Sequence, residues 1–205
     1  MTARGLFIVI DGVDGCGKST QAARLVAALR GARPAAPAHL REPGSTELGE
    51  SLRELLLAGA VDPVPAAEAL LFAAARRQML EERVEPALAA GQDVVCERFN
   101  GSTFAYQAVA GGLDEKHVLE LLRTWCGSPA PDVEFVLAID PELARARRGA
   151  DRDRIERKGA AFQARVAAGL ERYLNLEPRA RRIDGTQAAD AIAERILAEV
   201  AHARR

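Results

Sequence analysis

The feature that most constrains this chain is a glycine-rich loop between a short apolar run and a helical pattern. The apolar run covers residues 6–10. The residues that follow fit the spacing G-x-x-x-x-G-K-S and read Gly12-Val13-Asp14-Gly15-Cys16-Gly17-Lys18-Ser19. A buried strand, a glycine-rich turn and a helix in this order are what a phosphate-binding loop requires. A plain strand–helix turn without a ligand is the alternative, and the Lys-Ser pair argues against it.

This loop indicates a nucleoside triphosphate bound together with a metal ion. Glycines at positions 12, 15 and 17 let successive backbone N–H groups turn toward an anion, and the following helix adds its positive end. We expect the Lys18 ammonium to reach the β- and γ-phosphates and the Ser19 hydroxyl to hold Mg²⁺. ATP and Mg²⁺ are therefore the expected ligands of residues 12–19 and of Thr20.

Composition argues against several other classes of protein. The 205 residues suit one domain over residues 1–205, because the chain is short for two. A formal net charge of −1 provides no overall basic field for nucleic acid. Three cysteines and three histidines are too scattered for a disulfide framework or a zinc site. Since no leader pattern or membrane-length apolar stretch is visible, we expect a cytoplasmic protein with no membrane or nucleic-acid partner.

Short apolar runs alternate with helical patterns along the chain, which predicts an α/β fold with helices on both faces of a central parallel sheet. Five strands are expected, at residues 6–10, 39–41, 93–96, 133–139 and 181–183. Helices are expected at residues 18–30, 47–57, 66–90, 102–109, 115–125, 141–148, 156–174 and 188–202. Together with the loop, this order of elements predicts a P-loop NTPase fold.

The longest predicted helix, at residues 66–90, has a regular apolar pattern. Residues at helical spacing predict its buried face, namely Leu70, Leu71, Ala74, Met79 and Val84. Gly91 follows as the expected C-cap.

Arginine and aromatic residues indicate a second, anionic substrate opposite the first. Arg98 follows the strand at 93–96, and the carboxyl ends of strands are the usual ligand site of an open α/β sheet. Its guanidinium could grip a phosphate with two hydrogen bonds. Phe72 and Arg76 lie one helical turn apart and share a face. An aromatic plane and a forked donor on that face suit a flat base with carbonyl oxygens.

Structural alternatives stay open for all of these positions. Phe72 could be a core aromatic, and Arg98 could form a surface ion pair with Glu97. Packing, turn formation or solvation could also explain the residue types at other positions, namely Glu42, Arg53, Arg76, Tyr106 and Gln107.

Three segments make the chain resemble the thymidylate kinase family, whose members phosphorylate dTMP to dTDP with ATP. They are Arg41-Glu42-Pro43-Gly44, the Phe-x-x-x-Arg spacing of residues 72–76, and residues 98–107 with their Arg, Ser and Ala-Tyr-Gln. They occur in the expected order, and the resemblance runs from residue 7 to about residue 196.

The resemblance implies how the acceptor nucleotide is held. Arg53 and Arg98 would bind the dTMP phosphate, and Asp14 would position that phosphate and its metal-bound water. Phe72 would stack on thymine, and Arg76 would contact a thymine carbonyl oxygen.

The resemblance also implies the rest of the acceptor pocket. Ser102, Thr103 and Gln107 would complete the base and phosphate sites. Tyr106 would press on the sugar where a ribose 2′-hydroxyl would lie. Glu42 would approach the sugar or the phosphate.

An arginine-rich stretch at about residues 147–157 resembles the short, mobile lid of this family. Because residue 15 is glycine rather than arginine, the resemblance implies that the lid supplies charge to the transferred group, as in the bacterial members. Arg152 and Arg154 are the expected catalytic arginines, and Arg148 is expected to stack on adenine. A solvated run of charges is the alternative.

Two departures from the family's usual sequence bear on the site. Glu97 stands where an aspartate is usual, so contacts with the metal and its water could shift. A Glu-Arg pair after a strand also resembles the deoxynucleoside kinases. The bulky pair Thr103-Phe104 near the base leaves strict thymine specificity open.

Phosphoryl transfer to a phosphate needs positioning and charge neutralisation more than a general base. We therefore expect direct in-line transfer from ATP to dTMP, a step of dTTP biosynthesis, assisted by Lys18, Arg98 and the lid arginines. The alternatives are a kinase for another deoxynucleotide or a deoxynucleoside and, further away, a P-loop switch ATPase. The resemblance also implies a homodimer.

Overall fold

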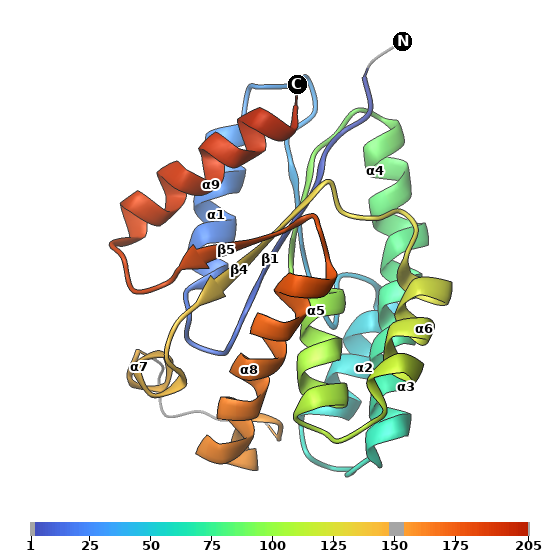
Figure 1. The fold of residues 1–205 in the computed structure, drawn as a ribbon. Coiled ribbons are helices and arrows are strands. Elements are labelled where there is room, and N and C mark those ends of the chain that lie inside the picture. Colours follow the sequence, from blue (N-terminus) through green and yellow to red (C-terminus); the bar gives the residue numbers. More distant parts are fainter. Residues whose placement is uncertain (1–2, 148–153, 205) are drawn as a thin grey trace.

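Five parallel strands form one sheet in the computed structural model, which describes residues 3–147 and 154–204 (Figure 1). The strand order is β2-β3-β1-β4-β5. The strands are β1 Phe7–Gly12, β2 Ala38–Arg41, β3 Val94–Glu97, β4 Val133–Ala138 and β5 Ala180–Asp184. Every residue of β1 is buried, as expected for a central strand covered by helices on both faces. The predicted parallel sheet is confirmed.

Helices occupy the remaining predicted stretches. They are α1 Lys18–Leu29, α2 Glu47–Leu57, α3 Pro65–Met79, α4 Glu85–Ala89, α5 Asn100–Thr103, α6 Glu115–Cys126, α7 Pro141–Ala146, α8 Ala160–Leu176 and α9 Ala189–Ala203. Short π-helical segments, η1 Leu80–Val84 and η2 Phe104–Val109, continue α3 and α5, and a 3-10 turn, η3 Glu156–Lys158, precedes α8. None of the described helices is long and apolar enough to cross a membrane.

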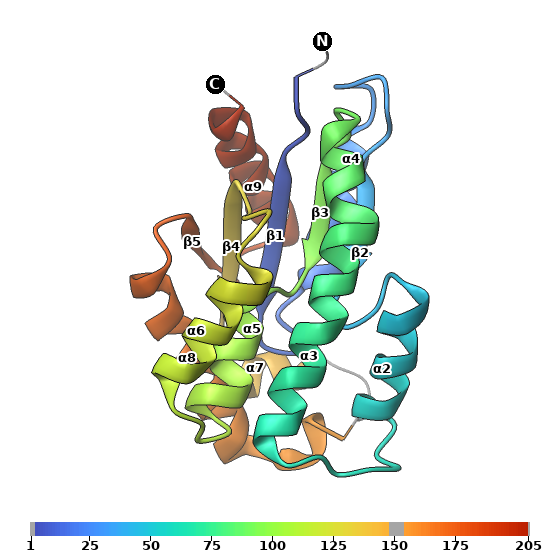
Figure 2. The same ribbon diagram turned by 90° about the vertical axis from the view of Figure 1, so that its right-hand side faces the viewer.

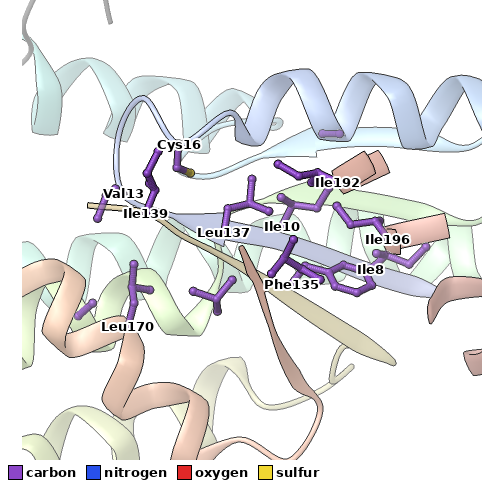
Figure 3. Packing of buried hydrophobic residues seen from close by; sticks show 14 of the residues in the cluster. Ile8, Ile10, Val13, Cys16, Phe135, Leu137, Ile139, Leu170, Ile192 and Ile196 are labelled. Carbon is purple, nitrogen blue, oxygen red and sulfur yellow. The ribbon is translucent and has the colours of Figure 1, made fainter. Parts of the chain in front are cut away.

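The helices form a layer on each face of the sheet. α1 and α9 cover one face, and α3, α4, α5, α6 and α8 lie on the other (Figures 1 and 2). Ile8 and Ile10 of β1 pack in the cluster with Ile192 and Ile196 of α9 (Figure 3). Phe7 and Val9 belong to the second cluster, because successive side chains of a strand point to opposite faces.

The buried face predicted for the long helix was only partly right. Met79 and Val84 are fully buried, but Leu70 is 58% exposed and Ala74 is also exposed. The face turned inward carries Glu68, Phe72 and Arg76 at intervals of four residues. Polar partners inside the fold, rather than apolar periodicity, decide which face of α3 is covered.

The carboxyl ends of the strands lie along one edge of the sheet. The glycine-rich loop follows β1 there, Glu42 follows β2 and Arg98 follows β3. Because β1 and β3 are hydrogen-bonded neighbours, this edge brings the loop and Arg98 together.

Glu134 is a buried acid in the middle of the sheet, with only 2% of its surface exposed. The Tyr173 hydroxyl donates to its carboxylate over 3.3 Å. Burial, with smaller contributions from Glu177 and Asp11, raises the pKa of Glu134 to about 8. The folded state therefore holds this proton over a pH range in which the unfolded chain has already lost it.

We predict that Glu134→Gln makes the free energy of unfolding less dependent on pH. In the wild type the stability linked to Glu134 is fully present below pH 4.5, the ordinary value, and declines as pH rises toward about 8. At about 1.4 kcal/mol per pH unit, this loss should approach about 5 kcal/mol over the full range and be absent in the variant. Urea unfolding at several pH values measures it, and equal slopes for both proteins would contradict the assignment.

Candidate active site

The glycine-rich loop has the conformation that its sequence predicts. Gly12, Gly15 and Gly17 have φ angles of 146°, 85° and 101°. A Cβ atom added at Gly15 would lie 2.1 Å from the Ala144 carbonyl oxygen, so a side chain there is excluded by space as well as by backbone angle. Among the residues that the structure describes, no side chain caps the start of α1, which leaves its positive end to the loop.

Lys18 lies folded over this loop. Its Nζ donates to the carbonyl oxygens of Gly12 (3.0 Å) and Val13 (2.9 Å) and is 3.7 Å from Asp14 Oδ1. The side chain is 8% exposed, so its charge is directed at the loop rather than at bulk solvent.

A cavity of about 1110 Å³ opens beside the loop, at the carboxyl edge of the sheet. It is larger than the usual pocket for one small molecule. Most of the predicted site residues line it, namely Asp14, Gly15, Cys16, Gly17, Lys18, Ser19, Thr20, Glu42, Arg53, Phe72, Arg76, Glu97, Arg98, Ser102, Thr103, Tyr106 and Gln107. Gly12 and Val13 lie in the loop but are not among the lining residues.

Arg98 faces Asp14 of the loop across this cavity. Its Nη2 donates to Asp14 Oδ1, and its Nη1 donates to Ser102 Oγ over 3.0 Å. The guanidinium also lies 5.2 Å from the centre of the Tyr106 ring, whose hydroxyl donates to Asp14 Oδ2 over 3.1 Å. Burial alone would lower the pKa of Arg98, but the Asp14 carboxylate outweighs it and the pKa rises. The alternative of a surface pair with Glu97 is not what the structure shows.

Asp11, which sequence reasoning missed, holds the Arg98 segment against the loop. Its fully buried carboxylate accepts hydrogen bonds from Gly12 N (2.7 Å), Ser102 N (2.9 Å) and Ser102 Oγ (2.7 Å). Phe99 N donates to it as well, over 3.3 Å. The sequence signal that could have identified Asp11 is its position directly after the apolar run at residues 6–10. An acid there is expected to be buried, and a buried carboxylate needs several hydrogen-bond donors.

Arg76 is almost completely buried, at 1% exposure, so the interpretation as a solvated residue was wrong. Its Nε and Nη2 contact Glu42 Oε2 at 2.6 and 2.5 Å. The remaining N–H groups face Asn100 Oδ1, Thr103 Oγ1 and the Phe99 carbonyl oxygen. These five contacts match the five donors of a guanidinium. A hydrogen bond from Arg76 to a thymine carbonyl oxygen would therefore require Arg76 to break one of these five contacts.

Glu42 keeps one oxygen out of this pair. Oε1 is buried and has no hydrogen-bond partner among the described residues. Burial raises the pKa of Glu42 in spite of the opposing effect of Arg76. Glu42 is among the residues that line the cavity.

Ser19, Glu97 and His39 form a chain of polar contacts beside the loop. The Ser19 hydroxyl donates to Glu97 Oε2 over 2.5 Å, and Glu97 Oε1 lies 2.9 Å from His39 Nε2. Sequence reasoning did not include His39. No group of three or more His, Cys, Asp or Glu side chains that could hold a metal ion occurs within residues 3–147 and 154–204. A hydroxyl and one carboxylate still suit Mg²⁺, which takes its other ligands from water and phosphates.

The three residues predicted to surround the base all line the cavity, namely Phe72, Thr103 and Gln107. Phe104, expected to crowd the base, is instead fully buried, with its ring 6.0 Å from that of Tyr173, and does not line the cavity. The π-helical turn η2 contains both Tyr106 and Gln107, and these consecutive residues both reach the cavity.

Of the arginines predicted to act from the lid, only Arg154 falls within the described residues, and it does not line the cavity. Its Nε donates to the Leu56 carbonyl oxygen over 2.9 Å, and its other nitrogens pair with Asp62 and Glu68. Arg148 and Arg152 lie outside the described residues. The catalytic roles of these three arginines stay predictions.

Comparison with known proteins agrees with this geometry. The sequence profile of the thymidylate kinases matches residues 10–196. The chain belongs to the thymidylate kinase family. It is 42% identical over 200 residues to a thymidylate kinase of Synechococcus sp. (strain RCC307), covering 94% of each chain, and 43% identical over 197 residues to that of Jannaschia sp. (strain CCS1), covering 93% of each. The crystal structure of thymidylate kinase from Ehrlichia chaffeensis resembles it with a TM-score of 0.78 and 27% identity, over 96% of this chain and 99% of that one. The chain therefore has the P-loop NTPase fold of this family.

We predict that Arg76→Met destabilises the fold by about 3–5 kcal/mol, because it leaves the buried Glu42 carboxylate without its cation. The double variant Glu42→Gln with Arg76→Met should recover a large part of this loss. Urea unfolding provides the measurement. Arg41→Met, which removes an exposed pair with Glu50, is the matched control and should cost less than about 1 kcal/mol. An Arg76 variant as stable as the control would contradict a structural role for this pair.

Proposed function

We propose that this protein transfers the γ-phosphoryl group of ATP to dTMP. The observation that carries the proposal is the position of two cations on one cavity: Lys18 in the loop after β1 and Arg98 after the neighbouring strand β3. An anion-binding loop and a half-buried guanidinium that face each other suit two phosphorylated substrates held end to end. The curated relatives described above are themselves thymidylate kinases.

The loop and Lys18 would hold the phosphates of ATP, and Ser19 with Glu97 would hold Mg²⁺. When bound, the metal would offset negative charge on the phosphates. The Ser19 hydroxyl and the Glu97 carboxylate already lie in contact, so no large rearrangement is needed to present both oxygens.

The acceptor nucleotide would occupy the opposite part of the cavity. Arg98 and Arg53 would bind its phosphate, and Phe72 would stack on its base. Tyr106, whose ring lies against Arg98, would pack on the sugar. The partnerless Glu42 Oε1 would accept a hydrogen bond from a sugar hydroxyl.

Transfer from one phosphate to another asks little of the protein beyond alignment and charge balance. An acceptor phosphate is already anionic near neutral pH, so no general base is needed. Lys18 and Arg98 would share the charge on the transferring group from its two sides. The burial of Lys18 strengthens this effect, since its surroundings screen charge less than water does.

Two alternatives are less well supported. A deoxynucleoside acceptor would leave the cavity-lining arginines Arg53 and Arg98 without the phosphate that suits them. A P-loop switch ATPase needs a second acidic strand end for its metal. The expected candidate, Asp140, instead caps α7 by accepting from the backbone N–H groups of Glu142 (2.7 Å) and Leu143 (3.4 Å).

An acceptor screen tests the proposal. We predict ADP release from ATP with dTMP as the preferred acceptor, measured beside dUMP, dCMP, dGMP and thymidine. Without an acceptor, ADP release should be slower by at least about 10³-fold, since water must be kept from the γ-phosphate. Preference for thymidine, or equal rates with and without dTMP, would contradict the proposal.

Variants of the two cations provide the control for this screen. Lys18→Ala and Arg98→Ala should each lower kcat by about 10³-fold or more, with unchanged circular dichroism. Arg195→Ala, an exposed arginine on α9 that does not line the cavity, should retain wild-type turnover.

We also propose that the protein forms a homodimer through α2, α3 and α6. These helices lie on one side of the molecule (Figure 2), where α3 contacts both α2 and α6. Leu55, Leu70 and Trp125 on them are 40%, 58% and 60% exposed. Large apolar side chains on adjoining helices are typical of a surface that is covered in an oligomer.

Sedimentation equilibrium should give twice the chain mass of 22.0 kDa. We predict that Leu70→Glu with Trp125→Glu gives the monomer mass, because two charges would be desolvated in the interface. Leu197→Glu, at an exposed position on α9, is the control and should stay dimeric. A wild-type monomer at micromolar concentration would contradict the dimer.

A further inference from the structure

Glu68 is a buried acid to which neither the motifs nor the proposed chemistry assign a role. It lies in the first turn of α3, is 3% exposed and does not line the cavity. Its Oε1 accepts a hydrogen bond from Gln107 Nε2 over 2.9 Å, and its Oε2 pairs with Arg154 Nη2. Lys158 Nζ lies 3.5 Å from Oε1. A buried carboxylate with one amide and two cations is a costly arrangement that calls for an explanation.

The contact with Gln107 decides which way the carboxamide of that residue faces. A carboxylate paired with cations offers only acceptors, so the –NH₂ group of Gln107 must be the part that faces Glu68. Gln107 Oε1 is then directed away from Glu68. No described residue donates to this oxygen, and it is not among the buried atoms that lack a partner. Because Gln107 lines the cavity, the atom it presents there is an acceptor.

The neighbouring Thr103 is oriented in the opposite sense. Arg76 Nη1 donates to Thr103 Oγ1 over 3.0 Å, so this oxygen already acts as an acceptor toward the protein. Its hydroxyl hydrogen is left to donate, and Thr103 also lines the cavity. The base end of the cavity therefore presents one acceptor, from Gln107, and one donor, from Thr103.

We propose that Glu68 is a positioning residue that selects the base of the acceptor nucleotide by fixing the amide of Gln107. A base that carries a ring N–H beside a carbonyl oxygen, as thymine and uracil do, complements this acceptor and donor. Cytosine has an unprotonated ring nitrogen and an amino group at the same positions. Its ring nitrogen, an acceptor, would face the acceptor of Gln107, and its amino group, a donor, would face the donor of Thr103. This inference rests on the proposed function, since it assumes a pyrimidine nucleotide in this part of the cavity.

The two cations explain how Glu68 stays in place. Arg154 also donates to the Leu56 carbonyl oxygen at the end of α2, and Lys158 lies 4.9 Å from the centre of the Phe162 ring. Both residues are thus anchored independently of Glu68. They supply countercharge to a carboxylate that would otherwise be buried alone.

The test replaces Glu68 by glutamine, which keeps its shape. A glutamine at 68 can either accept from Gln107 or donate to it, so the amide of Gln107 is no longer held in one orientation. The ratio of kcat/KM for dTMP over dCMP should then fall roughly tenfold or more, the size expected when one buried polar mismatch is relieved. The ratio for dTMP over dUMP should not change, because these bases differ only in a methyl group that Glu68 does not address.

These two ratios separate positioning from a general structural effect. A loosened site would change kcat for all three nucleotides together and leave both ratios as they were. In a Gln107→Met background, the Glu68→Gln substitution should no longer alter the dTMP over dCMP ratio, because it acts through Gln107. Asp62→Asn, which removes only the exposed partner of Arg154, should leave this ratio unchanged, since the contact between Glu68 and Gln107 remains.

If Glu68→Gln alone does not fold, the double variant Glu68→Gln with Arg154→Met removes both charges of the buried pair and carries the same expected ratios. Calorimetric dissociation constants for dTMP, dUMP and dCMP provide a reading independent of turnover. If the wild type phosphorylates dTMP but the variant has an unchanged ratio of dTMP over dCMP, the role of Glu68 is overturned while the proposed function stands. A wild type that neither binds nor phosphorylates dTMP or dUMP would overturn the proposed function and this inference with it.

Discussion

The carboxylate of Asp11 is the contact on which the geometry of the site depends. It ends the central strand β1 and is fully buried, and it binds the first amide of the phosphate loop and the Ser102 backbone and hydroxyl at once. The loop and the segment that begins at Arg98 come from strands far apart in the sequence. The pairing of β1 with β3 brings them together, and the Asp11 carboxylate then joins the loop to Ser102. Both substrates must be aligned within a fraction of an ångström for transfer, so a buried, multiply bonded group is a suitable joint.

The two arginines of the acceptor side differ in how many of their donors the protein already uses. Five contacts occupy Arg76, whereas the hydrogen bonds of Arg98 within the described part of the chain go to Asp14 and Ser102. Arg76 is therefore chiefly a brace that joins α3, the segment after β2 and the start of α5. Arg98 has fewer such contacts, as its proposed role of binding a phosphate requires. Two residues of the same type, both predicted as ligands, thus have different physical roles.

Local pattern predicted the strands and nearly all helix ends, because strand runs, helix caps and loop glycines are properties of neighbouring residues. Most of the residues expected around the cavity came instead from the resemblance to the thymidylate kinases. Long-range partners could not be predicted in this way. Leu70 has the spacing of a buried residue but is exposed, because the inward face of α3 is set by the polar contacts of Glu68 and Arg76. Asp11 and Glu68 look like ordinary charged residues in the sequence, and their importance comes from donors about 90 and 40 residues away. The π-helical turn at 104–109 is likewise invisible in a helical pattern, yet it lets the consecutive residues Tyr106 and Gln107 both reach the cavity.

The charges of the site also explain how the two cations Lys18 and Arg98 lie close together. Lys18 Nζ and Arg98 Nη2 both approach the same oxygen of Asp14, so one carboxylate offsets the repulsion between them and part of their desolvation. A phosphoryl group offers more oxygens and more charge than a carboxylate and can satisfy both cations at a wider separation. Asp14 thus keeps Lys18 and Arg98 directed at a common point between them. In the proposed reaction, a phosphoryl group passing from one side of that point to the other would stay within the field of both cations.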